Sequence, residues 1–226
     1  MLARLQNVTK RYRTTEGVRD LSLDFPEGEI VGVLGLNGSG KSTMLKLIAG
    51  LLFPTAGTLT VFGGSARGNR SRTVFLGETD TLWPWMTPRD ACRLMTGLYP
   101  DFEPHRFDEL LDVLDVPRRK TKAMSKGERG RLRLAMALAR SAKLYLLDEP
   151  LAGIDLLSRE KILMSLVREW HTDETILLST HEVAEAEGLF ERAIYLRDGR
   201  LALDVPAEQL RQQGGSVVQT FKEVLA

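Results

Sequence analysis

Cysteine is almost absent from this chain, which has a single one, Cys92, among 226 residues. A lone cysteine excludes an intrachain disulfide and a cysteine-based metal cluster. Cys92 lies in a stretch that favours a helix, so we interpret it as a half-buried helix residue and not as a catalytic thiol. Histidine is also scarce, at three residues, and the sequence around His105 and His171 assigns them no role.

Long hydrophobic runs are missing as well. No apolar stretch approaches the roughly 20 residues that span a bilayer. The beginning of the chain contains no uninterrupted apolar segment of signal-peptide length. We therefore expect an intracellular, cytoplasmic protein that reaches a membrane only where a partner holds it there.

The chain also has almost no net charge. Lysine and arginine number 31, and aspartate and glutamate number 30, which gives a net charge of +1. A nucleic-acid-binding domain normally carries a strongly basic surface, so we expect no nucleic-acid partner. Hydrophobic residues make up 43% of the chain and charged residues 27%, which is ordinary for a globular protein.

Glycine, in contrast, is concentrated in one motif, Gly35-Leu-Asn-Gly-Ser-Gly-Lys-Ser-Thr43. An apolar run at 30–34 precedes the motif and a helix-favouring segment at 44–49 follows it, as in the phosphate-binding P-loop. Glycines let backbone N–H groups approach an anion closely, and the helix presents its positive dipole end. Lys41 would place an ammonium among the terminal phosphates, and the Ser42 hydroxyl is placed to coordinate Mg²⁺. The motif predicts a site for nucleotide phosphates.

The elements along the chain predict an α/β fold. The predicted strands lie within 1–34, with turns at Glu16-Gly17 and Pro26-Glu-Gly28, and at 57–62, 73–76, 144–147, 175–179, 193–197 and 201–203. The predicted helices lie at 88–99, 106–114, 126–140, 156–170, 182–190 and 206–213. The run at 144–147 is continuously apolar, which is typical of a strand buried on both faces of a parallel sheet.

We therefore expect a P-loop NTPase core with a parallel sheet, an antiparallel β subdomain and a helical insertion subdomain. Within a single domain, the core is predicted to comprise 1–80 and 141–213. The helical subdomain is predicted at 81–140, and a C-terminal helical tail at 214–226.

An acidic pair, Asp148 and Glu149, follows the apolar run at 144–147. Parallel α/β sheets place ligands at the carboxyl ends of their strands. Asp148 suits the Mg²⁺ site of a P-loop protein, and Glu149 is placed to act as a general base on an attacking water. The alternative, a solvated acidic loop, is disfavoured by the P-loop upstream.

The order of these motifs resembles the ATP-binding subunits of ABC transporters, over essentially the whole chain. After the P-loop come Met124-Ser-Lys-Gly-Glu128, the acidic pair, Gly153-Ile-Asp155 and His181. The resemblance implies an ATPase that binds ATP and Mg²⁺ and powers a separate integral membrane permease, from the inner face of the cell membrane.

The resemblance also implies a head-to-tail dimer with a second copy of the chain, or with a paralogous ATPase subunit. Ser125 and Gly127 would contact the γ-phosphate held by the other copy, and Asp155 would lie at the dimer contact. From the residues alone, a hydroxyl and free N–H groups at a helix N-terminus can form an anion site. An ordinary N-cap serine is the other interpretation, and both can hold together.

Further roles carry over from the family by position. His181 would fix the γ-phosphate and the water, and Tyr12 would stack on adenine, unless it is only an aromatic at a strand end. Glu78 stands near the place of a glutamine that reaches Mg²⁺, which a carboxylate can also ligate. The expected ATP-binding residues of the P-loop are Gly35, Asn37, Gly38, Ser39, Gly40, Lys41, Ser42 and Thr43.

The signature segment departs from the usual Leu-Ser-Gly-Gly-Gln of the family. Lys126 replaces a glycine, and Glu128 replaces the glutamine. The negative charge of Glu128 is unfavourable near a phosphate unless it points away or pairs with Arg129 or Arg131. The Ser-Lys-Gly variant resembles exporter-like bacterial members, so we expect export.

An aromatic cluster, Trp83-Pro-Trp85, opens the helical region. In the family, a cleft in this region receives a coupling helix of the membrane subunit, so both tryptophans are candidate anchors. A local hydrophobic core is an equally good interpretation. A non-transport ATPase of the same family, acting on nucleic acid or ribosomes, is the alternative function. It is disfavoured by the absence of a long insertion or a second ATPase unit.

Overall fold

The computed structural model describes residues 1–155, 159–164 and 173–225. The chain divides into two compact units. The first unit comprises Met1–Phe75, Lys143–Glu149 and His171–Ala226, and the second comprises Leu76–Ala142 and Pro150–Trp170. Each unit is described by itself.

The first unit contains a six-stranded sheet of order β5-β6-β7-β3-β8-β9. Its strands are β3 (Ile30–Leu34), β5 (Thr73–Leu76), β6 (Leu144–Asp148), β7 (Thr175–Thr180), β8 (Arg192–Arg197) and β9 (Arg200–Pro206). The pairs β6–β7, β7–β3 and β3–β8 are parallel, and β9 runs antiparallel to β8. Every residue of β3, β6 and β7 is buried, as expected for strands covered on both faces.

The register of this sheet brings three strand ends together. Leu34 of β3 pairs with Thr180 of β7, and Asp148 of β6 pairs with Ser179 of β7. Because the strands are parallel, the segments that follow β3, β6 and β7 leave the sheet at the same edge.

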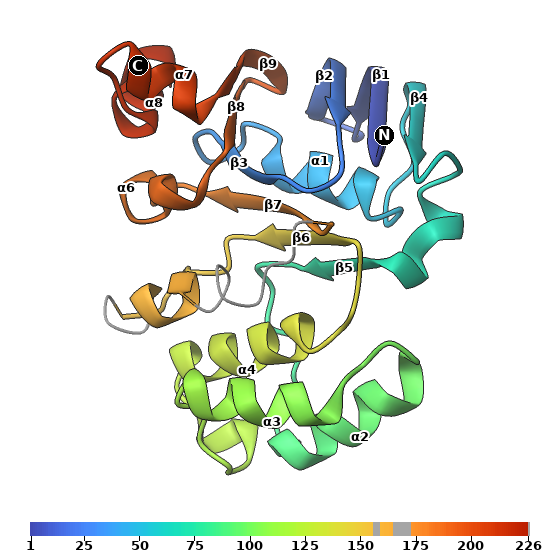
Figure 1. The fold of residues 1–226 in the computed structure, drawn as a ribbon. Helices are drawn as coiled ribbons and strands as arrows, with labels where there is room; N and C mark the ends of the chain where they lie inside the picture. The colour runs from blue at the N-terminus through green and yellow to red at the C-terminus, as the bar shows by residue number, and fades with distance from the viewer. Residues whose placement is uncertain (156–158, 165–172, 226) are drawn as a thin grey trace. The chain divides into compact units, whose positions relative to one another are not determined.

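A smaller antiparallel sheet of order β2-β1-β4 belongs to the same unit. It is built from β1 (Ala3–Arg11), β2 (Glu16–Phe25) and β4 (Ala56–Val61). Helix α1 (Lys41–Ile48) contributes Met44, Leu45, Leu47 and Ile48 to a core that also contains residues of both sheets. Figure 1 shows α1 between the two sheets. The expected α/β fold with an antiparallel β region is confirmed.

The second unit is helical. Its helices are α2 (Pro88–Leu98), α3 (Pro104–Val113), α4 (Lys126–Leu138) and a 3₁₀ turn at Thr121–Ala123; residues 159–164 are also helical. Thr87 caps α2 with Pro88 at its first position, as the sequence predicts. Cys92 is half-buried in α2, so that interpretation holds.

Several predicted boundaries are wrong. The first reversal of the chain precedes Glu16, because cross-strand pairing continues to Arg11 and Glu16, whose side chains form an ion pair of 2.9 Å. The helix predicted at 182–190 is divided into α6 (Val183–Ala186) and a 3₁₀ turn at Glu187–Leu189, which contains Gly188. Glycine weakens a helix interior. Of the helix predicted at 156–170, all but 159–164 lies outside the described residues.

The C-terminal part of the first unit contains α7 (Ala207–Gln212) and α8 (Val217–Leu225). The buried Tyr195 of β8 donates its hydroxyl to the Val217 carbonyl at 3.0 Å, which joins the start of α8 to the sheet. Burial raises the pKa of Tyr195 to about 12.

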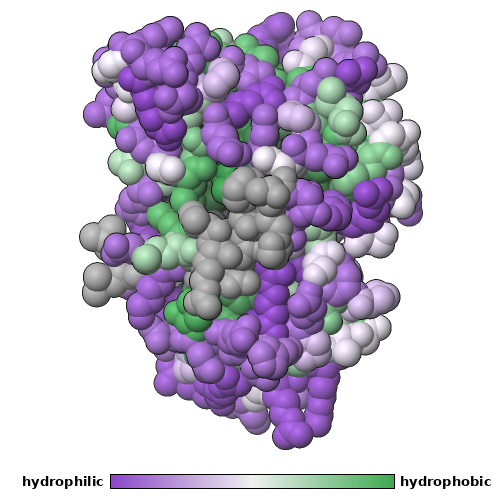
Figure 2. Space-filling view, in the orientation of Figure 1, coloured by the Kyte–Doolittle hydropathy of each residue, from purple (hydrophilic) through white to green (hydrophobic). Residues whose placement is uncertain are grey.

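Among the described residues, no helix has the length and hydrophobicity needed to cross a bilayer. Hydrophilic residues cover most of the face drawn in Figure 2, and hydrophobic ones occur there in scattered groups.

Candidate active site

The turn between β3 and α1 has a backbone that requires glycine. Gly38 has φ of 83° and Gly40 has φ of 104°, a region that other residues rarely adopt. A Cβ on Gly40 would lie 2.4 Å from the carbonyl oxygen of Gly17. Gly40 is the N-cap of α1 and makes no side-chain cap, so the first N–H groups of this helix are available to an anion.

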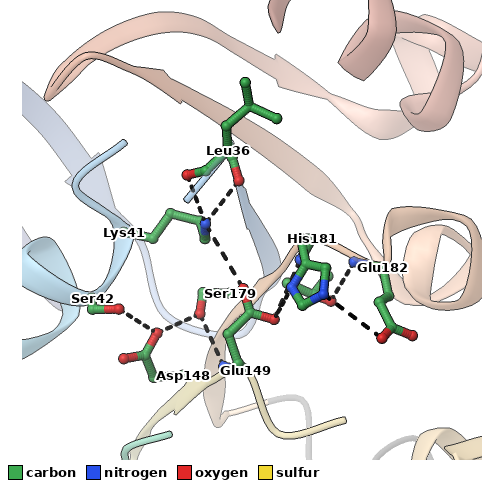
Figure 3. Close-up of polar contacts among 10 residues, drawn as sticks. Leu36, Lys41, Ser42, Asp148, Glu149, Ser179, His181 and Glu182 are labelled. Carbon is green, nitrogen blue, oxygen red and sulfur yellow. Dashed lines mark hydrogen bonds and ion pairs between the residues drawn. The ribbon is translucent and has the colours of Figure 1, made fainter. Parts of the chain in front are cut away.

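Lys41 lies at the start of α1, and its side chain is only 6% exposed. Its ammonium donates to the carbonyl oxygens of Gly35 at 2.7 Å and Leu36 at 3.2 Å. The carboxylate of Glu149 is 3.8 Å away. Figure 3 shows the ammonium between the Leu36 backbone and Glu149. Lys41 thus lies inside the turn, with its charge directed to where phosphates bind in a P-loop.

Asp148, at the end of β6, is 2% exposed. One of its oxygens accepts from the Ser42 hydroxyl at 3.0 Å and from the Ser179 hydroxyl at 2.7 Å. A buried carboxylate held by hydroxyls retains lone pairs for a cation, and Mg²⁺ prefers such oxygen ligands. Among the described residues, no group of three or more His, Cys, Asp or Glu side chains is arranged to hold a metal ion.

Glu149 follows Asp148 with φ of 51°, which is unusual for a residue other than glycine and is typical of functional sites. Its N–H donates to both the carbonyl and the hydroxyl oxygen of Ser179, at 3.1 Å each. This conformation turns the carboxylate of Glu149 away from Asp148 and toward His181 (Figure 3).

His181 follows β7, and its Nδ1 lies 2.9 Å from a carboxylate oxygen of Glu149. The backbone N–H of His181 donates to the same oxygen at 3.3 Å, and Nε2 lies 3.8 Å from Glu182. The side chain of His181 is 49% exposed, whereas that of Glu149 is 10% exposed. A carboxylate and an imidazole that share one hydrogen bond can together move a proton of a bound water.

The remaining P-loop side chains vary in exposure. Asn37 is exposed, whereas Ser39 is buried, and the hydroxyl of Ser39 has no hydrogen-bond partner among the residues that the structure describes. Tyr12, just after β1, is 43% exposed. Its hydroxyl lies 3.4 Å from that of Thr43. An exposed ring beside the P-loop is available for stacking.

Ser125, Gly127, Asp155 and Glu78 belong to the second unit. Ser125 is the N-cap of α4, where its hydroxyl accepts from the Glu128 N–H at 3.2 Å. Asp155 is 65% exposed and lies 3.7 Å from Arg131. Glu78 is exposed, and its carbonyl oxygen accepts from Arg133 at 3.2 Å.

Glu128 forms hydrogen bonds with Arg119, an arginine that the sequence analysis did not consider. Its carboxylate accepts from the Ser125 N–H at 2.7 Å and from Arg119 at 2.9 and 3.0 Å. Arg129 instead contacts Asp80 and the Met124 carbonyl. The Ser125 N–H, and then Arg119, hold the pKa of Glu128 below its ordinary value.

Ser179 is the site residue that the sequence alone did not indicate. It lies inside a strand run, where a serine looks like any buried small residue. Its position opposite Asp148 becomes visible only in the parallel register of β6 and β7.

Trp83 and Trp85 do not form a local hydrophobic core. They are 49% and 57% exposed, and their rings stack with centroids 5.6 Å apart and an interplanar angle of 10°. The Trp83 carbonyl accepts from the Thr121 hydroxyl at 2.6 Å.

The strand–turn–helix phosphate loop and the acidic end of β6 define a P-loop nucleoside triphosphatase. The sequence matches the ABC transporter family over residues 18–152. The chain therefore belongs to the ATP-binding subunits of ABC transporters, and it is an ATPase.

Relatives and solved structures agree with this family. The chain is 34% identical over 210 residues to the aliphatic sulfonates import ATP-binding protein SsuB of Pseudomonas putida, with 91% of this chain and 77% of SsuB covered. It is 35% identical over 211 residues to the taurine import ATP-binding protein TauB of a Jannaschia species, with 87% and 79% covered.

Among solved structures, an ATP-binding subunit of an ABC transporter superposes with a TM-score of 0.87 at 27% identity, covering 99% of both chains. The dimeric ATP-binding cassette MJ0796, bound to ADP and Pi, superposes at 0.81 and 27% identity, covering 91% of this chain and 98% of the other. The subunit is thus one of a class that dimerises, and a non-transport role is not favoured. The exporter-like assignment is not supported, because both relatives are named as import proteins.

Proposed function

We propose that the subunit hydrolyses ATP at the P-loop and that this hydrolysis drives transport through a separate membrane permease. One observation carries the proposal for the site. The Glu149 carboxylate lies between the Lys41 ammonium, at 3.8 Å, and the His181 imidazole, at 2.9 Å. A base, a phosphate-binding cation and a water-orienting imidazole thus lie at one sheet edge.

In this mechanism, the N–H groups at the start of α1 and the turn Gly35–Gly40 bind the phosphates. The Lys41 ammonium exchanges its contacts with the Gly35 and Leu36 carbonyls for γ-phosphate oxygens. Glu149 accepts a proton from the attacking water, and His181 orients that water and the γ-phosphate. The exposed ring of Tyr12 stacks on adenine, and Asn37, Ser39 and Thr43 line the phosphate site.

Ser42 and Asp148 would hold Mg²⁺, because their oxygens lie 3.0 Å apart at the end of α1 nearest the phosphates. Bound Mg²⁺ neutralises charge that develops on the β- and γ-phosphates. Glu78 is a further candidate ligand, by its position in the sequence. A requirement for Mg²⁺ in hydrolysis, lost on chelation, is expected.

We further propose that the ATP site is completed by a second copy of the chain. Ser125 and Gly127 lie at the start of α4, where a helix presents N–H groups that favour an anion, and Asp155 would belong to the same dimer contact. The dimer of MJ0796 bound to ADP and Pi supports this arrangement.

For the permease we propose a contact at the stacked pair Trp83 and Trp85. Exposed tryptophans are enriched where proteins bind partners. The named relatives act in import, which favours import here. Aliphatic sulfonates and taurine are the first compounds to test.

The proposal is tested with Glu149→Gln, which keeps the size of the side chain but removes the base. The ATPase rate is expected to fall by ~10²–10⁴-fold, while ATP binding persists and ATP-bound dimers accumulate. Glu208→Gln is the matched control, because it makes the same change at an exposed side chain of α7. An unchanged ATPase rate in Glu149→Gln would remove Glu149 from the mechanism.

Transport is measured with the subunit and its co-purified permease in liposomes. Import moves the compound toward the compartment that holds ATP, and export moves it away. Glu149→Gln must abolish either movement. ATP hydrolysis without permease association or transport would leave an ATPase with another task.

A further inference from the structure

The N-terminus of α4 contains the carboxylate of Glu128 at the helix end where a phosphate would be expected to bind. Glu128 is the third residue of α4 and forms a capping box with Ser125. In this box the Ser125 N–H donates to Glu128 at 2.7 Å, and the Glu128 N–H donates to the Ser125 hydroxyl oxygen at 3.2 Å. The Ser125 hydroxyl proton has no acceptor among the described residues, so it can be donated to a ligand.

Arg119 offsets the charge of Glu128 by direct hydrogen bonds, and Arg131 adds to this through its charge. Arg119, in the segment before the 3₁₀ turn at Thr121–Ala123, donates to both oxygens of Glu128, at 3.0 and 2.9 Å. The side chain of Glu128 is 20% exposed and that of Arg119 is 53% exposed. Arg129 has other contacts, at Asp80 and the Met124 carbonyl.

The adjacent arginine, Arg118, has a different role. It contacts Asp108 and Asp112 of α3, at 2.8 Å each. Both of those partners are exposed. The chain therefore contains two neighbouring arginines of similar exposure, of which only Arg119 meets the α4 N-terminus.

We infer that Arg119 is a positioning residue for the shared ATP site: it neutralises Glu128, so that Ser125 and the α4 N-terminus accept the triphosphate held by a second copy. This inference rests on the proposed function. Without Arg119, a carboxylate bonded to the Ser125 N–H repels the incoming phosphates. Glutamine needs no such partner, because it completes a capping box without charge.

The test is ATP-dependent dimerisation, measured by sedimentation velocity in the Glu149→Gln background, which hydrolyses ATP slowly. Arg119→Ala is expected to weaken the dimer about tenfold, because each of its shared sites contributes about threefold. Arg118→Ala, the matched control, is expected to leave the dimer unchanged. Arg119→Lys keeps the positive charge and is expected to retain most of the dimer affinity.

Removing the charge of Glu128 distinguishes a role of Arg119 in neutralising that charge from a role in stabilising α4. Arg119→Ala combined with Glu128→Gln is expected to restore dimerisation, although the ion pair is gone. If the pair only stabilised α4, the double variant would be as weak as Arg119→Ala. That result, or an Arg119→Ala dimer as tight as its parent, overturns the inference. A parent that forms no dimer with ATP contradicts the proposed function instead.

Discussion

The buried hydroxyl of Ser179 connects the Asp148 carboxylate with the backbone of Glu149. Ser179 donates to Asp148 at 2.7 Å and accepts from the Glu149 N–H at 3.1 Å. The first contact satisfies a buried charge, which is costly to leave without donors. The second helps to hold the unusual backbone of Glu149, and with it the direction of the carboxylate toward His181. We therefore expect Ser179 to be a positioning residue for Asp148 and Glu149.

Removing this hydroxyl should affect stability and activity together. In Ser179→Ala, the lost hydrogen bond to a charged group is expected to lower the free energy of unfolding by roughly 1.5–3 kcal/mol. The ATPase rate is expected to fall as well, because Glu149 is less firmly held. Urea unfolding and steady-state ATP hydrolysis measure the two effects.

Ser22→Ala is the matched control. Its hydroxyl accepts one backbone N–H, from Asn7 at 2.9 Å, in the antiparallel sheet. This variant is expected to lose about 0.5–1.5 kcal/mol with an unchanged ATPase rate. If Ser179→Ala behaved like Ser22→Ala, the positioning role of Ser179 would be excluded.

Local geometry determines the positions of the P-loop residues and of the acidic pair, and these positions agree with the sequence, whereas the roles of the residues stay predictions. Lys41 and Ser42 follow from the P-loop motif, and Asp148 and Glu149 from their place after a buried strand. Arg119 could not be predicted as the partner of Glu128. It lies in a loop before α4, so the regular spacing of residues along a helix does not indicate the contact. Arg131 and Arg129 lie three residues and one residue beyond Glu128, but Asp155 and Asp80 contact them instead.

At the scale of elements, the turn from β3 to α1 is the most constrained part of the site. Gly40 combines φ of 104° with the nearby carbonyl of Gly17. Gly63 also has positive φ, at 72°, but a Cβ there would meet nothing within 4 Å. A comparison of substitutions at Gly40 and Gly63 therefore separates the cost of backbone strain from the cost of steric overlap.

Gly40→Ala should therefore be more harmful than Gly63→Ala. Backbone strain alone is expected to cost ~1–3 kcal/mol at either position, and the overlap with Gly17 adds to it at Gly40. Urea unfolding gives the stability difference, and titration with ATP is expected to show weaker binding only for Gly40→Ala. Equal losses in the two variants would mean that the turn adapts to the extra methyl group.

Elements with strong local signals were predicted correctly, and the wrong boundaries lie where such signals are weak or misleading. The parallel strands followed from continuous apolar runs, and α2 from its Thr87–Pro88 start. The reversal before Glu16 was misplaced because Glu16-Gly17 has turn chemistry, whereas the strand pairing of Arg11 with Glu16 extends β2 through it. The ends of these strands depend on which residues of the neighbouring strand they pair with, and the local sequence does not contain that information.

At the scale of the whole molecule, the phosphate loop and the α4 N-terminus belong to different units of the chain. The first unit contains Lys41 and Glu149, and the second contains Ser125 at the start of α4. If the site is shared between copies, defects in the two halves should complement each other.

We therefore expect activity from a mixture of two inactive variants. Lys41→Ala removes the phosphate-binding ammonium, and Ser125→Arg blocks the α4 N-terminus. A mixed dimer contains one intact site, with Lys41 from one copy and Ser125 from the other. Equal amounts are expected to recover about a quarter of wild-type ATPase activity in a symmetric dimer, since half of the dimers are mixed.

The control for this mixture replaces Ser125→Arg by the double variant Lys41→Ala/Ser125→Arg, so that no intact site can form. Thermal unfolding of each variant verifies that Ser125→Arg still folds despite losing its cap. Recovery in the first mixture and none in the second would require a site built from both copies. Equal rates in the two mixtures would instead place every catalytic group on one chain. The N-terminus of α4, with its capping box of Ser125 and Glu128, would then have no role in the ATP site.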